Sequence, residues 1–165
     1  MRNVKFIFAT CVILACNSKN HPPSLADKNT ILSLKQTADI LYDQNEYETA
    51  AKYLDTLIAI DSLNGEYYFK RGYCNAMLFK YYLSTNDYNK AASLNYRKSS
   101  AYFNMGLNYS LVNDSIAILY FEKCYETDST QIKAKEKIRE LKEKLTPSER
   151  QQYDIMADSV LFRSI

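Results

Sequence analysis

The chain has 165 residues, of which 47% are hydrophobic and 24% are charged, with only three glycines and three prolines. This composition excludes collagen-like, low-complexity and disordered proteins and predicts one compact domain. Without residues 1–15, which carry two basic and no acidic side chains, nineteen basic residues balance nineteen acidic ones, so the clustered positive charge that nucleic-acid binding requires is missing. One histidine and four cysteines without a Cys-x-x-Cys pair offer no ligand set, so we expect no metal, cofactor or nucleic-acid partner.

The amino terminus has the pattern of an export signal. Residues 1–5 include the basic side chains Arg2 and Lys5 and no acidic one, and residues 6–15 form an uninterrupted, uncharged and largely apolar run. Ten residues rise about 15 Å as a helix, which is half of the roughly 30 Å hydrocarbon core, so this run is too short for a permanent membrane span. Residues 1–15 are therefore predicted to be a cleaved signal peptide.

The end of this run, Ile13-Leu14-Ala15-Cys16, resembles the lipobox of bacterial lipoproteins. The resemblance implies that Cys16 is lipid-modified and becomes the first mature residue, which places the protein at a membrane of the bacterial cell envelope, by expectation the outer membrane. The alternative is an ordinary secretory signal cut after Ala15, which also exports the chain. The polar residues 16–30 include Pro22-Pro23, which bars a helix, and are expected to form a tether.

An internal repeat fills the middle of the chain. Residues 68–72 (YFKRG) recur as residues 102–106 (YFNMG), a shift of 34 residues that aligns an aromatic pair and a rare glycine. The second halves of three copies align at shifts of 34 and then 33 residues. The copies cover approximately residues 31–64, 65–98 and 99–130.

Each copy contains two amphipathic stretches of helix length, and strand alternation is absent. The expected helices cover residues 31–43, 47–60, 66–78, 81–94, 101–112 and 115–126. Polar residues predict the turns at residues 44–46 and 113–114. Copy two has no such break at Phe79-Lys80, and the 33-residue third copy implies a shortened turn near Asn113.

A 34-residue helix–turn–helix unit resembles the tetratricopeptide repeat. Small residues stand at its two close-packing positions, namely Ala38, Gly72 and Gly106 in the first helices and Ala50, Ser84 and Ala117 in the second. Asn75 departs from the aromatic residue usual at its position. The resemblance implies an all-α fold, a right-handed superhelical stack of antiparallel helix pairs; a generic helical bundle is the alternative.

The last segment, residues 131–165, is predicted to be a degenerate helix pair that closes the stack, because each repeat buries its apolar face only on its neighbours. The first helix has one apolar face, consisting of Ala134, Ile138, Leu141 and Leu145, among charged residues. Residues 146–149 (TPSE) form a capping box with proline at the first helical position. The second helix has the apolar stripe Tyr153, Met156, Val160 and Leu161.

Catalytic motifs are missing. The sequence has no Gly-x-Ser-x-Gly elbow, phosphate-binding glycine-rich loop or His-Glu-x-x-His, so we expect no enzyme activity. Cys124 stands at a packing position and is expected to be buried. A Cys74–Cys124 disulfide is an open alternative in an exported chain.

The resemblance further implies that the first helices line a concave groove that binds a partner. The expected groove residues are Lys35, Asp39, Tyr42, Phe69, Tyr73, Met77, Phe103, Leu107 and Leu111. The last six form two apolar lines with a spacing of four residues. Because such stripes usually pack inside a protein, both core and groove stay open for them.

The sequence thus leads to the hypothesis of a non-enzymatic scaffold, a membrane-tethered lipoprotein that binds a peptide segment or helix of another cell-envelope protein. One alternative is a glycan- or small-ligand-binding lipoprotein, since fifteen tyrosines offer many rings for stacking. Another is an accessory subunit of an envelope assembly or secretion complex.

Overall fold

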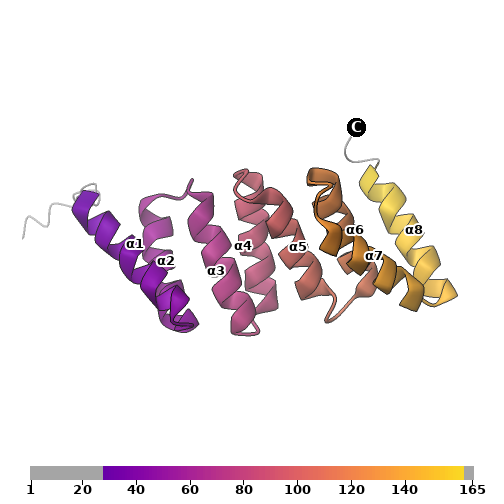
Figure 1. The fold of residues 1–165 in the computed structure, drawn as a ribbon, viewed down its shortest axis with the longest axis horizontal. Helices are drawn as coiled ribbons and strands as arrows, with labels where there is room; N and C mark the ends of the chain where they lie inside the picture. Colours follow the sequence, from indigo (N-terminus) through magenta and orange to yellow (C-terminus); the bar gives the residue numbers. More distant parts are fainter. Residues whose placement is uncertain (1–27, 162–165) are drawn as a thin grey trace, which may run out of the picture.

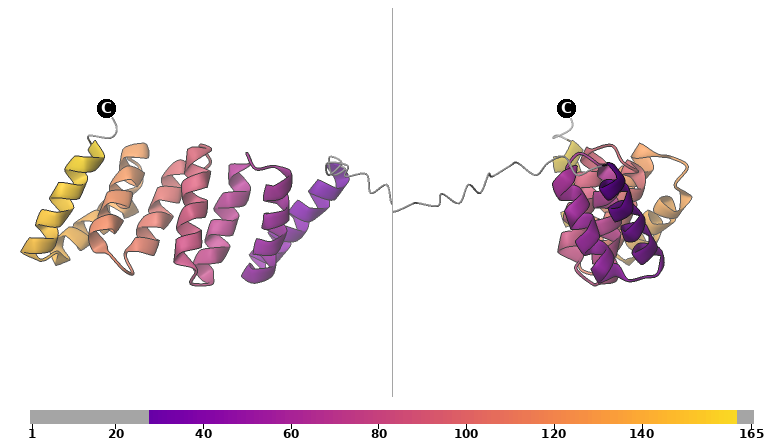
Figure 2. Two further views of the ribbon diagram at one scale, coloured as in Figure 1. Left: turned by 180° about the vertical axis from the view of Figure 1, so that it is seen from behind. Right: turned by 90° about the vertical axis from the view of Figure 1, so that its left-hand side faces the viewer.

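A computed structural model describes residues 28–161, and these form eight α-helices without a strand (Figure 1). The helices are α1 (Lys28–Asp43), α2 (Tyr47–Ile60), α3 (Gly65–Met77), α4 (Tyr81–Ser93), α5 (Lys98–Tyr109), α6 (Asp114–Thr127), α7 (Ile132–Lys144) and α8 (Pro147–Leu161). They follow one another in a row from α1 to α8, and the left-hand view of Figure 2 shows the same row from behind. The predicted all-α stack of helix pairs is confirmed.

The core is a series of local clusters rather than one centre. From α1 to α7 each helix packs against the next one, and α8 also contacts α6. Leu54 and Leu57 of α2 are buried with Cys74 of α3, Tyr88 of α4 with Met105 of α5, and Phe121 of α6 with Leu141 of α7. Each helix pair therefore depends on its neighbours for burial, as stacked repeats do.

Two glycines lie where paired helices approach most closely. A Cβ atom on Gly106 would lie 2.7 Å from ring atoms of Phe121, and one on Gly72 would lie 3.2 Å from the Cβ of Asp87 and from the Tyr88 ring. Ala38, at the equivalent place in α1, is 1% exposed. The prediction that this repeat position admits only a small residue is confirmed.

Helices α3, α4 and α6 begin and end within one residue of the predicted positions, and the larger differences from the sequence prediction are in α1 and α5. Helix α1 begins at Lys28, so residues 28–30 belong to the helix and not to the tether; no proline in this stretch prevents the extra turn. Helix α5 covers Lys98–Tyr109 instead of residues 101–112. The turn after it is not shortened, because residues 110–113 separate α5 from α6 whereas residues 78–80 separate α3 from α4. The side chain of Asn113 accepts a hydrogen bond from the Ile116 N–H, and this N-cap starts α6 at residue 114.

Helices α3 and α4 are separated even though the sequence shows no polar break there. Phe79 occupies the left-handed region with φ 59°, as Asn45 does with φ 63° between α1 and α2. The N–H of Lys80 donates to the Asn75 carbonyl, and the N–H of Glu46 donates to the Leu41 carbonyl 34 residues earlier. The turn backbone is thus repeated although its central residue is not.

The final helix pair has the predicted faces. Ala134, Leu141 and Leu145 are buried on the α6 side, and Ile138 is partly buried. The capping box is formed, with the Thr146 N–H donating to Glu149 Oε2 at 2.8 Å. In the last stripe Tyr153 is buried and Met156 half-buried, while the side chains of residues 160 and 161 lie outside the described part.

Cys74 and Cys124 are both buried and free, so the disulfide alternative is wrong and the predicted burial of Cys124 is confirmed. Burial raises the pKa of the Cys74 thiol to about 12, which keeps it protonated at neutral pH. Between residues 28 and 161 no helix is long and apolar enough to cross a membrane.

Candidate functional site

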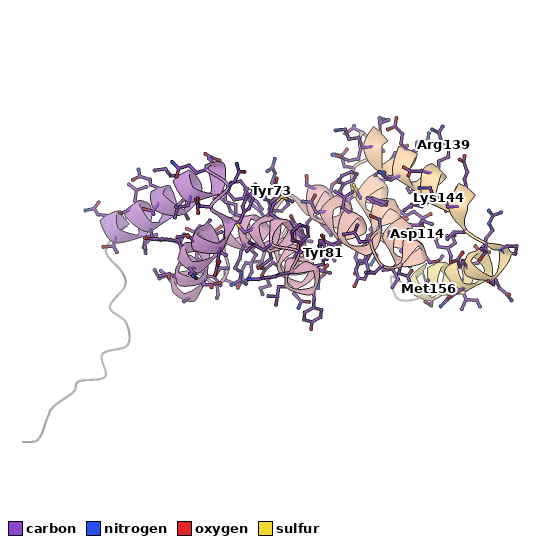
Figure 3. The ribbon with its side chains drawn as sticks, turned by 90° about the horizontal axis from the view of Figure 1, so that it is seen from below. Tyr73, Tyr81, Asp114, Arg139, Lys144 and Met156 are labelled. Carbon is purple, nitrogen blue, oxygen red and sulfur yellow. The ribbon has the colours of Figure 1, made fainter. Side chains whose placement is uncertain are left out.

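A cavity of about 310 Å³ opens between α3 and α5, beside the turn that joins α3 to α4. We name it the α3–α5 groove, and it is lined by Tyr73, Ala76, Met77, Phe79, Tyr81, Tyr88, Asn104, Leu107, Asn108 and Leu111. None of these ten side chains carries a formal charge at neutral pH. In Figure 3 the labelled Tyr73 and Tyr81 lie in the middle of the row, apart from Arg139 and Lys144 on α7.

Four of the expected groove residues come together here. Tyr73 and Met77 of α3 line the groove with Leu107 of α5 and with Leu111 of the turn that follows α5. Met77 is 42% exposed, Leu107 39% and Leu111 60%, although all three are large and apolar. The last two residues of each predicted apolar line therefore belong to one accessible surface.

The amino-terminal members of those lines, Phe69 and Phe103, do not line the groove. Phe69 is 8% exposed, and its ring centre lies 5.3 Å from that of Tyr88 and 5.8 Å from that of Tyr96. Phe103 is half-buried, with its ring centre 5.3 Å from that of Phe121. The groove expectation is thus corrected for Phe69, which α4 covers, while Phe103 packs partly against α6 and is not among the residues that line the cavity.

Tyr42 lies beside the groove and supports it. Its ring centre is 5.3 Å from that of Tyr73, and Tyr47 completes the cluster at 5.9 Å from Tyr73. Such aromatic contacts contribute about 0.5–1.5 kcal/mol each beyond the buried area. Tyr42 therefore holds the Tyr73 ring in place from α1.

Lys35 and Asp39 belong to a chain of ion pairs between α1 and α3. The Nζ of Lys35 lies 2.8 Å from Glu66 Oε2, and the Nζ of Lys70 lies 2.7 Å from Glu66 Oε1 and 2.6 Å from Asp39 Oδ1. Two cations and two anions balance one another. Burial by itself would raise the pKa of Glu66, but the hydrogen bonds from Lys35 and Lys70 lower it overall.

This lowered pKa predicts an acid-sensitive contact. A carboxylate whose pKa is lower in the folded state stabilises the fold above its unfolded pKa and loses that effect as the pH falls. We expect the free energy of unfolding to fall less between pH 6 and pH 3 in Glu66→Gln than in the natural protein, measured by urea denaturation. The matched control is Glu48→Gln, because Glu48 makes only an exposed pair with Lys52 and its variant should follow the natural curve. Equal pH dependence of Glu66→Gln and the natural protein would contradict the assignment.

A larger cavity of about 450 Å³ lies on another face of α3, between α2 and α4, and sequence reasoning missed its polar network. Arg71 donates from Nε to Asp87 Oδ2 at 3.0 Å and from Nη1 to Asp55 Oδ1 at 2.7 Å. Asn75, the departure from the repeat pattern, donates to the same buried Asp87 at 3.0 Å. These hydrogen bonds connect three helices, α2, α3 and α4, through one polar network.

The groove also contains residues that sequence reasoning did not place there, namely Phe79, Tyr81, Tyr88, Asn104 and Asn108. Asn108 is held from behind, because its Nδ2 donates to Ser84 Oγ at 2.9 Å and to Thr85 Oγ1 at 3.2 Å. The available signal was Phe79 itself, an aromatic residue where the other two copies carry asparagine. Within the described helices no group of metal-ligating side chains could hold an ion.

No family model and no curated protein matches the sequence. Several solved structures share its fold. The first TPR of Spaghetti (RPAP3), bound to the HSP90 peptide SRMEEVD, superposes with a TM-score of 0.63 at 21% identity over 71% of this chain and 94% of that chain. The Yersinia enterocolitica type III secretion chaperone SycD, in complex with a peptide of the translocator YopD, superposes with a TM-score of 0.65 at 17% identity, over 70% of this chain and 95% of that chain. MamA superposes with a TM-score of 0.66 at 25% identity, over 78% of this chain and 76% of that chain. The chain therefore has the tetratricopeptide-repeat fold.

Proposed function

We propose that this protein is a non-enzymatic interaction scaffold that binds a peptide segment or helix of another protein through the α3–α5 groove. The observation that carries the proposal is the exposure of Met77, Leu107 and Leu111 in one cavity without a charged side chain. Contiguous exposed apolar surface of this kind is typical of sites that bind apolar anchors of a partner.

The similar structures support a peptide as the partner. RPAP3 is bound to a peptide of HSP90 and SycD to a peptide of YopD, so the same stack of helices presents a surface to short segments of other proteins. In this chain four charged residues of α1 and α3, Lys35, Asp39, Glu66 and Lys70, are paired with one another, whereas the lining of the cavity itself is uncharged. The partner segment therefore contacts the groove with apolar side chains.

We further propose that the scaffold is tethered to a bacterial envelope membrane through a lipid on Cys16, by expectation the outer membrane, and that its partner is another envelope protein. The support is the basic start, the ten-residue uncharged run and the Ile13-Leu14-Ala15-Cys16 motif in the sequence. Residues 1–27 lie outside the described part of the structure.

Cys16→Ser is expected to release the protein from the membrane fraction, because the substitution removes the sulfur that would carry the lipid. Membrane fractionation with mass spectrometry of the amino terminus measures this. Cys11→Ser is the matched control and should stay membrane-bound, since Cys11 lies inside the predicted signal peptide. A natural protein that is soluble and begins with an unmodified Cys16 or Asn17 would contradict the lipid anchor.

The binding proposal is tested by photocrosslinking in the native cell. A benzophenone amino acid at position 107 should crosslink one defined partner, which mass spectrometry identifies. The same probe at Leu63, which is 74% exposed and does not line the groove, is the control and should not crosslink that partner. Equal crosslinking from both positions, or none from position 107, would contradict the groove as the binding surface.

A further inference from the structure

The turn between α3 and α4 holds a large aromatic side chain in a backbone conformation that disfavours it. Phe79 has φ 59°, in the left-handed region where glycine and asparagine are the usual residues. Asn45 and Asn95 occupy the same conformation at the ends of α1 and α4, with φ 63° and 56°. Phenylalanine is thus the exception at an otherwise ordinary helix end.

Burial does not offset this unfavourable conformation. Phe79 is 77% exposed, and its one described aromatic contact is edge-on to Tyr81, with ring centres 6.2 Å apart. Packing of the folded chain therefore does not explain why phenylalanine stands here. The fold requires the left-handed turn but not a phenylalanine in it, and bulky residues held in this conformation are concentrated at functional sites.

The position of Phe79 indicates what that function is. It lines the α3–α5 groove together with Met77 and Leu111, and Val112, 76% exposed, follows Leu111 in the chain. The exposed ring thus extends the apolar surface from the cavity to its edge. The Asn104 and Asn108 side chains, one helical turn apart, add uncharged amide groups to the same lining.

We infer that Phe79 is a partner-binding residue that closes over a large, apolar, uncharged side chain of a bound peptide segment, and so determines which segments bind. This inference rests on the proposed function. The occupant follows from complementarity, since no lining residue carries a charge and the four charged groups between α1 and α3 are already paired. The volume of about 310 Å³ is at the lower end of small-molecule pockets and suits peptide side chains better than a whole cofactor.

The test substitutes the residue that the turn itself prefers. Because asparagine tolerates the left-handed conformation, Phe79→Asn should raise the melting temperature of the full-length chain while weakening peptide binding. Tyr82→Asn is the matched control, since Tyr82 is an equally exposed aromatic residue, 78%, that does not line the groove. A lower melting temperature for Phe79→Asn would show that the ring is structural and overturn the inference.

The probe is a random dodecapeptide library displayed on phage and selected on the purified full-length chain. We expect enriched peptides to share large apolar residues without adjacent charges, and their affinity, measured by fluorescence polarisation, to fall at least about tenfold on Phe79→Asn and to stay unchanged on Tyr82→Asn. Enrichment of acidic peptides, no enrichment, or equal binding to Phe79→Asn overturns the inference.

A second pair of variants separates this inference from the proposed function. If enriched peptides bind Phe79→Asn normally but lose binding to Met77→Glu with Leu107→Glu, the groove binds peptides and the role of Phe79 is wrong. If the peptides bind both variants normally, the proposal that the α3–α5 groove is the binding surface is wrong as well. A dimer of the natural chain that Phe79→Asn converts to monomers in analytical ultracentrifugation identifies a second copy as the occupant and overturns the peptide partner.

Discussion

Replacing Met77 and Leu107 together by glutamate is expected to abolish partner binding while the domain stays folded. Both side chains are substantially exposed, and they come from neighbouring helices that form the two sides of the groove. Each apolar anchor buried by a partner contributes roughly 1.5–3 kcal/mol. Losing two such contacts weakens binding by about 3 kcal/mol or more, which is on the order of 150-fold, and burying the new carboxylates adds to the loss. Circular dichroism and the affinity for the crosslinked partner measure the two effects.

The matched control is Leu63→Glu with Ile155→Glu. These side chains are 74% and 64% exposed and do not line the groove, so the same change of charge should leave binding intact. Tyr73 is a poorer choice for this test, because its ring packs against Tyr42 and Tyr47. Unfolding of the Met77 and Leu107 variant would show that these side chains are core, and unchanged binding would move the binding surface elsewhere.

Gly106→Leu is expected to lower the free energy of unfolding by about 3 kcal/mol, at the upper end of the range for overpacked cores. The first side-chain atom would already lie 2.7 Å from the Phe121 ring, which is fully buried with Phe103 against it. The better helix propensity of leucine returns at most about 1 kcal/mol, so the overpacking dominates. Urea denaturation measures the difference.

Two alanine variants test whether overpacking causes this loss of stability. Gly72→Ala should destabilise less than Gly106→Ala, because the added Cβ would meet its neighbours at 3.2 Å instead of 2.7 Å. A Gly106→Leu variant that is more stable than the natural protein would show that the glycine is not at a helix contact and that the repeat alignment is wrong.

The sequence by itself determined the repeat and its helices. The 34-residue shift that aligns Gly72 with Gly106 predicted the close helix contacts, and the periodicity predicted α2 to its residues, 47–60. These features are accessible from one chain because helix formation and repeat packing depend on residues close together in sequence. The same local periodicity located Met77, Leu107 and Leu111 on apolar lines.

Only the tertiary structure divided those lines into core and groove. Phe69, Tyr73 and Met77 share one face of α3, yet Phe69 is buried and Met77 is exposed, because the helices around α3 cover one end of that face and leave the other open. Likewise, the spacing of four residues already places Lys70 beside Glu66 on α3, but only the tertiary structure brings Lys35 of α1 to Glu66 and Lys70 to Asp39 of α1. Burial and charge pairing depend on contacts between helices, and a periodic pattern along one helix does not contain the distance to the next.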